Sequence, residues 1–169
     1  MIRVALVSDT HGALDARVAE VVATCDLAVH AGDIGAPGVL AQLQPLSGRV
    51  IAVRGNNDTP LQWPRGSESL LHDLPEQVVV ELPGGMLALE HGHRVLPSNQ
   101  RHARLRERHP GARCIVYGHT HRLLVDAERE PWVLNPGAAG RIRTYGAPSC
   151  LVLNADEAGW SVDIHAFRG

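Results

Sequence analysis

Five short clusters of histidine, aspartate and asparagine stand in this chain at the ends of apolar runs of strand length. Taken singly, each has an ordinary explanation, because an aspartate or asparagine after a strand is typical of a turn and one H-x-H pair is weak evidence. Taken together, they supply carboxylate, amide and imidazole donors without thiolate, a set that suits Mn²⁺, Fe or Zn²⁺ in five- or six-coordinate sites. The clusters are Asp9 with His11, Asp33, Asn56, His91 with His93, and His119 with His121.

The number of donors also bears on the chemistry. Seven or eight donors are too many for one ion, and they suit two ions roughly 3.5–4 Å apart, the arrangement that supports in-line displacement at phosphorus. A carboxylate that bridges two cations stays ionised, because their combined charge favours the anion. The residue types therefore indicate a site for two metal ions.

The hydrophobic pattern predicts the elements that must position these clusters. Apolar runs at residues 2–8, 27–31 and 49–54 alternate with helical stretches at 14–23 and 37–43. This order predicts a β-α-β-α-β unit and a right-handed, largely parallel sheet. Because ligands in open α/β sheets bind beyond the carboxyl ends of the strands, we expect the clusters to meet at one edge.

The rest of the chain predicts one Arg-rich helix and several strands. A Pro- and Gly-bearing stretch predicts a loop over residues 57–69, and residues 99–109 predict the helix, capped by Ser98 or Asn99. The other expected strands lie at 77–82, at 86–93, within 112–121 and in most of the chain after about residue 123. Alternating apolar residues predict a half-buried final strand, and these are Trp160, Val162, Ile164 and Ala166.

Composition and charge limit the classes of function. With 169 residues, of which 44% are hydrophobic and 20% charged, we expect one domain, residues 1–169, with a sizeable core. The formal net charge of −2 gives no overall field that draws the protein to nucleic acid or anionic lipid. Cys25, Cys114 and Cys150 are scattered inside or beside apolar runs, which indicates reduced, buried thiols in a cytoplasmic protein. The N-terminal apolar run is too short for a membrane span and predicts a first strand.

The segments DTHG, GD, GNND, HGH and GHTH follow one another along the chain. In this order and at these spacings they resemble the calcineurin-like metallophosphoesterases. The short length, and GNND in place of the larger family's GNH[DE], are most similar to the small phosphodiesterases of the YfcE/MJ0936 type, relatives of the retromer subunit Vps29. The resemblance covers nearly the whole chain and implies an α/β fold, a four-layer α-β-β-α sandwich of two mixed β-sheets flanked by helices.

The resemblance also implies a set of metal ligands. It implies two divalent ions, with Mn²⁺ favoured and Zn²⁺, Fe or Ni²⁺ as alternatives, and a metal-bridging hydroxide as the nucleophile. No side chain is therefore assigned as catalytic. The implied ligands are Asp9, His11 and His121 for one ion, Asn56, His91 and His119 for the other, and Asp33 as the bridge.

Three further residues are candidates for contacts with the ligands or the substrate. Asn57 stands where the larger family has a histidine that assists the leaving-group oxygen, and an amide cannot act as that general acid. Because general acid help is worth about 10²–10⁴-fold, we expect a preference for diesters and for good leaving groups. Asp58 either orients Asn56 or is a turn residue. His93 is expected to face the substrate or to lie outside the ligand set.

Several other residues have ordinary explanations. Ala138 stands where the family's NPGS stretch commonly has serine, so no hydroxyl contact is expected there. Arg141 and Arg143 are candidates for phosphate contact, although arginines in a Gly-rich loop are more often solvated. Trp63 is expected to be exposed, serving an interface, a pocket rim or the core. The remaining histidines are expected to bond locally or to pack, and these are His30, His72, His102, His109 and His165.

The function implied by the resemblance is a dinuclear-metal-dependent phosphodiesterase that acts on a small phosphodiester or nucleotide-like substrate. Relatives that form dimers or tetramers imply a homo-dimer or homo-tetramer. One alternative is a non-catalytic, Vps29-like protein-binding scaffold, but a competent donor at every ligand position favours an enzyme. Another is a nucleotide pyrophosphatase or phosphomonoesterase of the same superfamily. A nuclease would be expected to present a broad basic surface, which the net charge disfavours.

Overall fold

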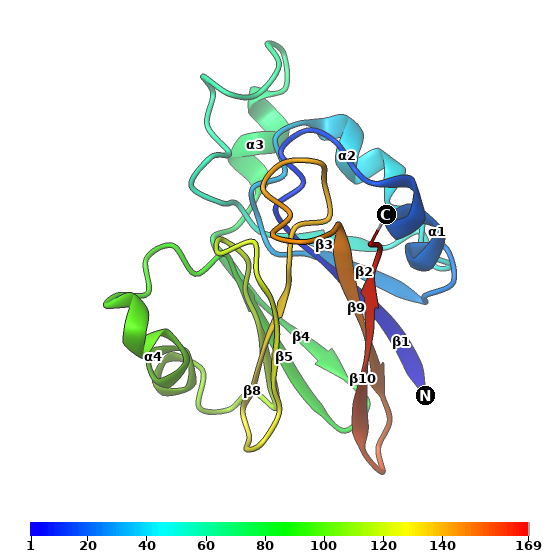
Figure 1. Ribbon diagram of the computed structural model, residues 1–169, viewed down its shortest axis with the longest axis vertical. Coiled ribbons are helices and arrows are strands. Elements are labelled where there is room, and N and C mark those ends of the chain that lie inside the picture. The colour runs from blue at the N-terminus through cyan, green and yellow to red at the C-terminus, as the bar shows by residue number, and fades with distance from the viewer. Residues whose placement is uncertain (169) are drawn as a thin grey trace.

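Two β-sheets of five strands each pack face to face in the computed structural model, which describes residues 1–168 (Figure 1). Helices cover the outer faces of the sheets, so the layers run helix, sheet, sheet, helix. In each sheet three neighbouring strands pair in parallel, and the other two strands are joined by antiparallel pairing. The expected four-layer sandwich of mixed sheets is confirmed.

The first sheet has the strand order β10-β9-β1-β2-β3. Its parallel strands are joined by helices, which confirms the predicted β-α-β-α-β unit, while β9 and β10 add antiparallel strands on the other side of β1. The strands are β1 Ile2–Val7, β2 Leu27–His30, β3 Val50–Ala52, β9 Ser149–Ala155 and β10 Trp160–Ala166, and the connecting helices are α1 Ala16–Val22 and α2 Pro37–Gln42.

The second sheet has the strand order β4-β5-β6-β8-β7, in which β5, β6 and β8 are parallel. The chain enters it after α3 and leaves it after β8, where it returns to the first sheet. The elements are α3 Glu68–Asp73, β4 Gln77–Leu82, β5 Gly85–Glu90, the 3₁₀ turn η1 Ser98–Gln100, α4 Arg101–Arg108, β6 Cys114–Val116, β7 Leu123–Asp126 and β8 Trp132–Pro136.

The main core fills the space between the two sheets, because alternate residues of each strand point inward. In β1, Val4 and Leu6 face the second sheet, whereas Ala5 and Val7 face α1. The outer face of the second sheet is covered by α4, whose Leu105 is fully buried against the sheet. The strands are therefore apolar on both faces at their centres, as the continuous hydrophobic runs predict.

Two predictions about helices were wrong. The predicted loop over residues 57–69 runs into α3, a short helix whose Leu71 packs against Trp63 and Val39. No side chain caps α3, so this packing rather than a sequence signal accounts for it. Ser98 and Asn99 lie in η1, and α4 begins at Arg101 without a side-chain cap.

Two predictions about the exposure of apolar residues were also wrong. Trp63 was expected to be exposed but is only 4% exposed, and of its three expected roles the structure shows the core, under α2 and α3. Ile164 is 58% exposed, because β10 is the outermost strand of its sheet, so only Trp160 and Val162 of the predicted face pack on the core. The three cysteines are free and buried, as expected.

Candidate metal centre

The parallel strands of each sheet end level with one another. In the first sheet Val7 of β1 pairs with His30 of β2, which pairs with Ala52 of β3. The same holds where Leu89 of β5 pairs with Val116 of β6. Each of the five clusters begins within a few residues of one of these strand ends. The topology therefore brings segments from across the chain to one edge of the sandwich, as predicted.

The backbone at this edge is bent in an unusual way. Five residues of the predicted ligand set have positive φ angles, a conformation that costs an ordinary residue about 1–2 kcal/mol. A side chain on Gly55 would overlap the carboxylate of Asp33, so the loop before Asn56 needs glycine there. The positive φ values are 54° at Asp9, 46° at His11, 56° at Asp33, 68° at His119 and 58° at His121.

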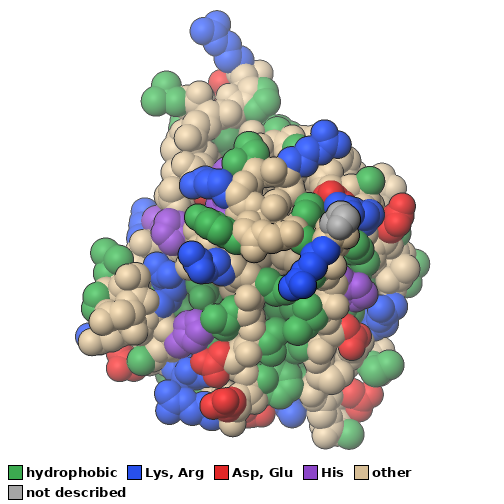
Figure 2. Space-filling view, in the orientation of Figure 1, with side chains coloured by type: hydrophobic (Ala, Val, Ile, Leu, Met, Phe, Trp, Pro, Cys, Tyr) green, Lys and Arg blue, Asp and Glu red, His purple; other side chains and the backbone are tan. Residues whose placement is uncertain are grey.

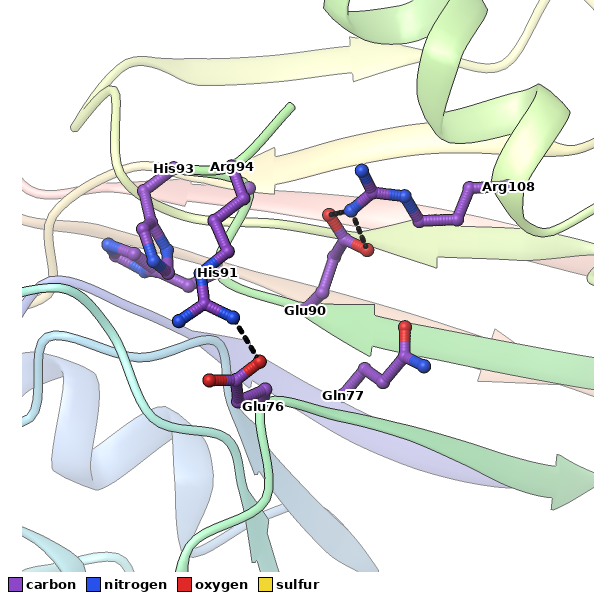
Figure 3. A pocket seen from close by; sticks show the side chains of 8 residues that line it. Glu76, Gln77, Glu90, His91, His93, Arg94 and Arg108 are labelled. Carbon is purple, nitrogen blue, oxygen red and sulfur yellow. Dashed lines mark hydrogen bonds and ion pairs between the residues drawn. The ribbon is translucent and has the colours of Figure 1, made fainter. Parts of the chain in front are cut away.

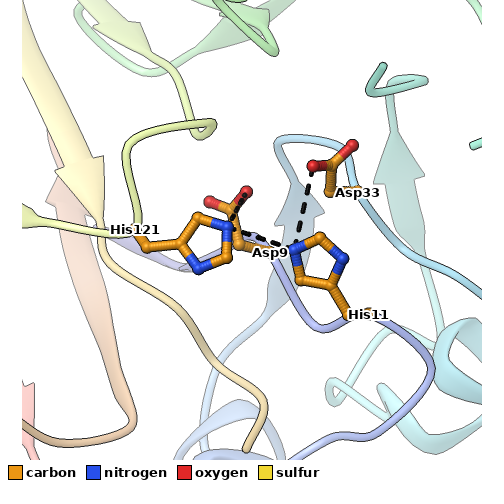
Figure 4. A group of neighbouring side chains, drawn as sticks. All are labelled: Asp9, His11, Asp33 and His121. Atoms are coloured by element: carbon orange, nitrogen blue, oxygen red, sulfur yellow. Dashed lines mark hydrogen bonds and ion pairs between the residues drawn. The ribbon is translucent and has the colours of Figure 1, made fainter. Parts of the chain in front are cut away.

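Four of the predicted ligands form a first group of donors (Figure 4). Asp9, His11, Asp33 and His121 each place a potential ligand atom within 4.8 Å of those of the other three. Nε2 of His121 lies 3.5 Å from Oδ1 of Asp9 and 3.1 Å from Nε2 of His11, which lies 3.8 Å from Oδ2 of Asp33. This group has the donor types of a divalent metal site.

The other predicted ligands form a second group beside the first. Oδ1 of Asn56 lies 3.1 Å from Nε2 of His91 and 3.1 Å from Nδ1 of His119. Nε2 of His91 lies 3.3 Å from Oδ1 of Asp33. Since Oδ2 of Asp33 faces His11, the two oxygens of this carboxylate face different groups.

Hydrogen bonds behind the rings orient two of the histidines. Nδ1 of His91 lies 2.7 Å from the carbonyl oxygen of Ala31, and Nδ1 of His121 lies 3.2 Å from that of Arg143. A carbonyl can only accept, so each Nδ1 carries a proton and Nε2 of each ring is directed into the site. Nε2 of His121 faces Nε2 of His11 at 3.1 Å, an approach that requires a proton or a cation between the two atoms. The residues present thus fit bound divalent cations.

The pKa values of the two carboxylates of the site are shifted in opposite directions. Burial raises the pKa of Asp9 to about 7. Burial also acts to raise the pKa of Asp33, but hydrogen bonds from His91 and Asn57 outweigh it and hold that pKa below its usual range. Burial and the charge of His91 lower the pKa of His119 to about 4. Burial lowers the pKa of His11 and His121 too, so these rings are neutral, as ligands must be, at pH 7.

Asn57 and Asp58 support the two groups from behind. Asn57 donates to both oxygens of Asp33, from its backbone nitrogen at 2.8 Å and from Nδ2 at 2.6 Å. Asp58 is buried and accepts from the backbone nitrogens of Gly35 at 2.9 Å and Gly55 at 2.8 Å. It therefore ties the loop that follows β2 to the loop that follows β3.

Sequence reasoning missed several supporting contacts. Asn135 donates from Nδ2 to the carbonyl oxygen of Gly118 at 2.8 Å and so holds the GHTH loop. The hydroxyl of Ser8 lies 2.7 Å from Oδ2 of Asp9. Trp63 donates from Nε1 to Asp58 at 2.8 Å. Only the place of Asn135 in the NPG stretch hinted at such a role, because buried polar contacts between distant segments leave no local pattern.

The other candidate residues lie around the two groups. The ring of His93 lies 5.4 Å from that of His91, and its buried Nδ1 has no hydrogen-bond partner among residues 1–168. Ala138 is fully buried, and the side chains of Arg141 and Arg143 are exposed.

The five remaining histidines differ in their surroundings. His30 is buried and lies 2.9 Å from the hydroxyl of Thr10, and His109 lies 2.9 Å from Glu90. His102 bonds Asp126, His72 is exposed, and His165 stacks on Phe167.

The fold and the site define a class of protein, an α/β sandwich with a possible metal-binding site of aspartate and histidine at its strand ends. Residues 2–158 match the calcineurin-like phosphoesterase superfamily domain. The chain therefore belongs to this superfamily, as the ordered motifs predicted.

Individual relatives agree with this assignment. The chain is 29% identical over 141 residues to a protein of Methanocaldococcus jannaschii described as a probable metallophosphoesterase, with 80% of this chain and 67% of the relative covered. The crystal structure of Vps29 from Entamoeba histolytica in complex with zinc has a TM-score of 0.72 at 19% identity and covers 98% of both chains. An archaeal phosphodiesterase has a TM-score of 0.71 at 22% identity, covering 97% of this chain and 100% of its own. Among the described residues, no helix has the length and apolar character needed to cross a membrane.

Proposed function

We propose that this protein is a metal-dependent phosphodiesterase whose site holds two divalent cations. The observation that carries the proposal is the position of Asp33, whose Oδ2 faces His11 at 3.8 Å and whose Oδ1 faces His91 at 3.3 Å. A carboxylate that faces two separate groups of donors is suited to bridge two cations. The proposed ligands are Asp9, His11 and His121 on one side, Asn56, His91 and His119 on the other, and Asp33 between them.

Bound cations in such a site neutralise the oxygens of a phosphate ester and lower the pKa of a water that serves as nucleophile. The donor set suits Mn²⁺, with Zn²⁺, Fe or Ni²⁺ as alternatives. The chain itself holds Asp33 in its ionised form through hydrogen bonds with His91 and Asn57, and burial lowers the pKa of His119. It also directs His91 and His121 through the carbonyls behind them.

The surface beside the site favours a diester. One cleft, of about 470 Å³, is lined by His91 of the second group, and another, of about 300 Å³, is lined by His11 of the first group together with Asn57. A phosphodiester carries two organic substituents, and the two clefts offer a place for each. Figure 2 shows basic and acidic side chains intermixed on the face that it displays, which suits a small substrate better than a nucleic acid.

The testing experiment compares bis-p-nitrophenyl phosphate with p-nitrophenyl phosphate. Metal-stripped protein receives Mn²⁺, Zn²⁺ or Mg²⁺, and turnover is followed by release of p-nitrophenol. We expect metal-dependent cleavage with preference for the diester, and two equivalents of metal per chain by elemental analysis. Preference for the monoester would contradict the diester assignment and the interpretation of Asn57.

Two variants separate the site from general effects of charge. Asp33→Asn is expected to abolish turnover, because a neutral amide cannot bridge two cations. Asp73→Asn is the matched control, since Asp73 lies in α3 with an exposed side chain, and it is expected to retain full activity. Equal activity in both variants would overturn the proposed site.

A protein-binding scaffold is the second candidate, because the fold is shared with Vps29. Tightly bound metal with no turnover of either ester would favour this scaffold over the enzyme. The expected homo-dimer or homo-tetramer stays a prediction.

A further inference from the structure

Two arginines lie beside the candidate metal centre, where two clefts meet. The 470 Å³ cleft beside His91 is also lined by His93 and Arg94 (Figure 3). A second cleft, of about 310 Å³, shares His93 and Arg94 and is lined further by Asn56 and Arg54. Arg94 therefore lines both clefts that open from the second group of donors. A substrate held at that group lies near Arg94 whichever cleft it occupies.

The two guanidinium groups converge on one carboxylate. Nη1 of Arg94 bonds Oε2 of Glu76, and Nη2 of Arg54 lies 3.5 Å from Oε1 of the same side chain. Each oxygen of Glu76 is thus met by a different arginine. Because a guanidinium has five N–H donors, both arginines keep further donors free. The carboxylate of Glu76 marks a place where the chain stabilises an anion.

The Glu76 carboxylate can move away from the two arginines at little cost. The side chain of Glu76 is 47% exposed and that of Arg94 is 63% exposed, and exposed ion pairs add little to stability. A phosphate group carries more charge and more acceptor oxygens than a carboxylate, and it matches the planar guanidinium well. It can therefore take the place of Glu76 between the arginines at little cost.

The second arginine–glutamate pair of the cleft is different. Glu90 is buried, is bonded by Arg108 at 3.1 Å and lies 2.9 Å from Nε2 of His109. Figure 3 shows this pair on the opposite side of the cleft from Arg94. Removal of a buried carboxylate from its partners is costly, so an incoming anion does not displace Glu90 from Arg108. Arg94 and Arg54 are the arginines of these clefts that share an exposed carboxylate, which an incoming anion can replace.

We propose that Arg94 and Arg54 bind a second phosphate group of the substrate, which displaces Glu76. The preferred substrates are then phosphodiesters that carry a further phosphate beyond the scissile one. This inference rests on the proposed function, because it assumes that the scissile phosphate lies at the candidate metal centre.

The test uses two chromogenic esters that differ by one phosphate. They are the p-nitrophenyl ester of thymidine 5′-phosphate and the same ester with an additional 3′-phosphate. The wild-type protein is expected to have the higher kcat/KM for the second ester. Arg94→Gln is expected to lower the ratio of the two kcat/KM values by roughly fivefold to tenfold, the loss expected for one charged hydrogen-bonding partner at a partly exposed site. Glu76→Gln is expected to raise the ratio, because the competing charge is removed.

Arg104→Gln serves as the matched control. Arg104 lies on α4, pairs with Glu107 at 3.0 Å and lines neither cleft, so the ratio should equal that of the wild type. The proposal is overturned if the wild type does not prefer the 3′-phosphorylated ester. It is also overturned if Arg94→Gln lowers kcat/KM equally for both esters, since Arg94 would then act on the centre and not on the second phosphate.

A binding measurement keeps this inference separate from the proposed function. If no ester is hydrolysed, the phosphodiesterase proposal fails, and calorimetric titration with thymidine 3′,5′-bisphosphate and with thymidine 5′-phosphate tests the arginines alone. Tighter binding of the bisphosphate by wild type than by Arg94→Gln supports the subsite. Equal affinity for the two nucleotides refutes it.

Discussion

At the residue scale, Asn57 supports a predicted metal ligand instead of assisting the leaving group. The amide cannot assist a leaving group as a histidine would, yet it donates to both oxygens of Asp33. These hydrogen bonds favour the ionised carboxylate and fix its orientation between the two groups of donors. The side chain thus supports the bridge, a function that its sequence position alone does not indicate.

We predict that Asn57→Ala weakens metal binding. The variant keeps the backbone hydrogen bond to Asp33 but loses the one from Nδ2, and loss of such an outer partner typically costs about 10–100-fold in metal affinity or activity. Competition with a chelating dye measures the affinity. Asn99→Ala, in the exposed turn η1, is the control and should bind metal as the wild type does. An unchanged affinity in Asn57→Ala would show that its side chain does not support Asp33.

At the scale of elements, the loop between β3 and α3 is an organised part of the site. Asp58 accepts hydrogen bonds from Gly35 of the loop after β2 and from Gly55 of its own loop, and Trp63 donates to the same carboxylate from the core beneath α2 and α3. The chain from Asn56 to Trp63 is therefore anchored at both ends. The stability of this small core and the position of Asn56 are coupled through Asp58.

We predict that Trp63→Phe lowers both stability and metal affinity. The variant keeps an aromatic ring but removes the hydrogen bond to the buried Asp58, which should cost about 1–3 kcal/mol in the free energy of unfolding, measured with urea. Trp160→Phe is a matched control, because it removes a bond of the same 2.8 Å length to Pro83, away from the site. It should lower stability alone. A loss of metal affinity in both variants would refute the coupling.

The β-α-β-α-β succession and the five clusters could be predicted from the sequence, because buried parallel strands give continuous apolar runs with polar residues at their ends. The helix α3 could not, since it depends on Leu71 packing against Trp63 and not on a cap. Ile164 was misjudged because alternation does not reveal that β10 is an outermost strand. The tie between Asp58 and Gly35 joins residues 23 positions apart and has no local signal.

At the scale of the whole molecule, the two sheets bring together titratable groups whose pKa values are shifted in opposite directions. The pKa of Asp9 is raised on folding, so the stability contributed by its proton is present at low pH and is lost as the pH rises through about 7. The pKa of His119 is lowered to about 4, so its contribution is present above its ordinary value and is lost as the pH falls toward 4. Burial opposes charge on His91, but contact with Asp33 outweighs it and raises that pKa.

These directions predict how metal binding depends on pH. Between pH 6 and pH 8 the protons that a divalent cation must displace are those of Asp9 and His91, since His119 is already neutral there. Because Asp9 has a pKa of about 7, we expect more protons to be released on binding at pH 6 than at pH 8. Calorimetric titration of Mn²⁺ in buffers of different ionisation enthalpy measures the number of protons released.

The gain in Tm on adding metal should accordingly be larger at pH 8 than at pH 6, because affinity for the folded state sets that gain. Equal proton release at both pH values would contradict this expectation, because it would show that Asp9 does not titrate between pH 6 and pH 8.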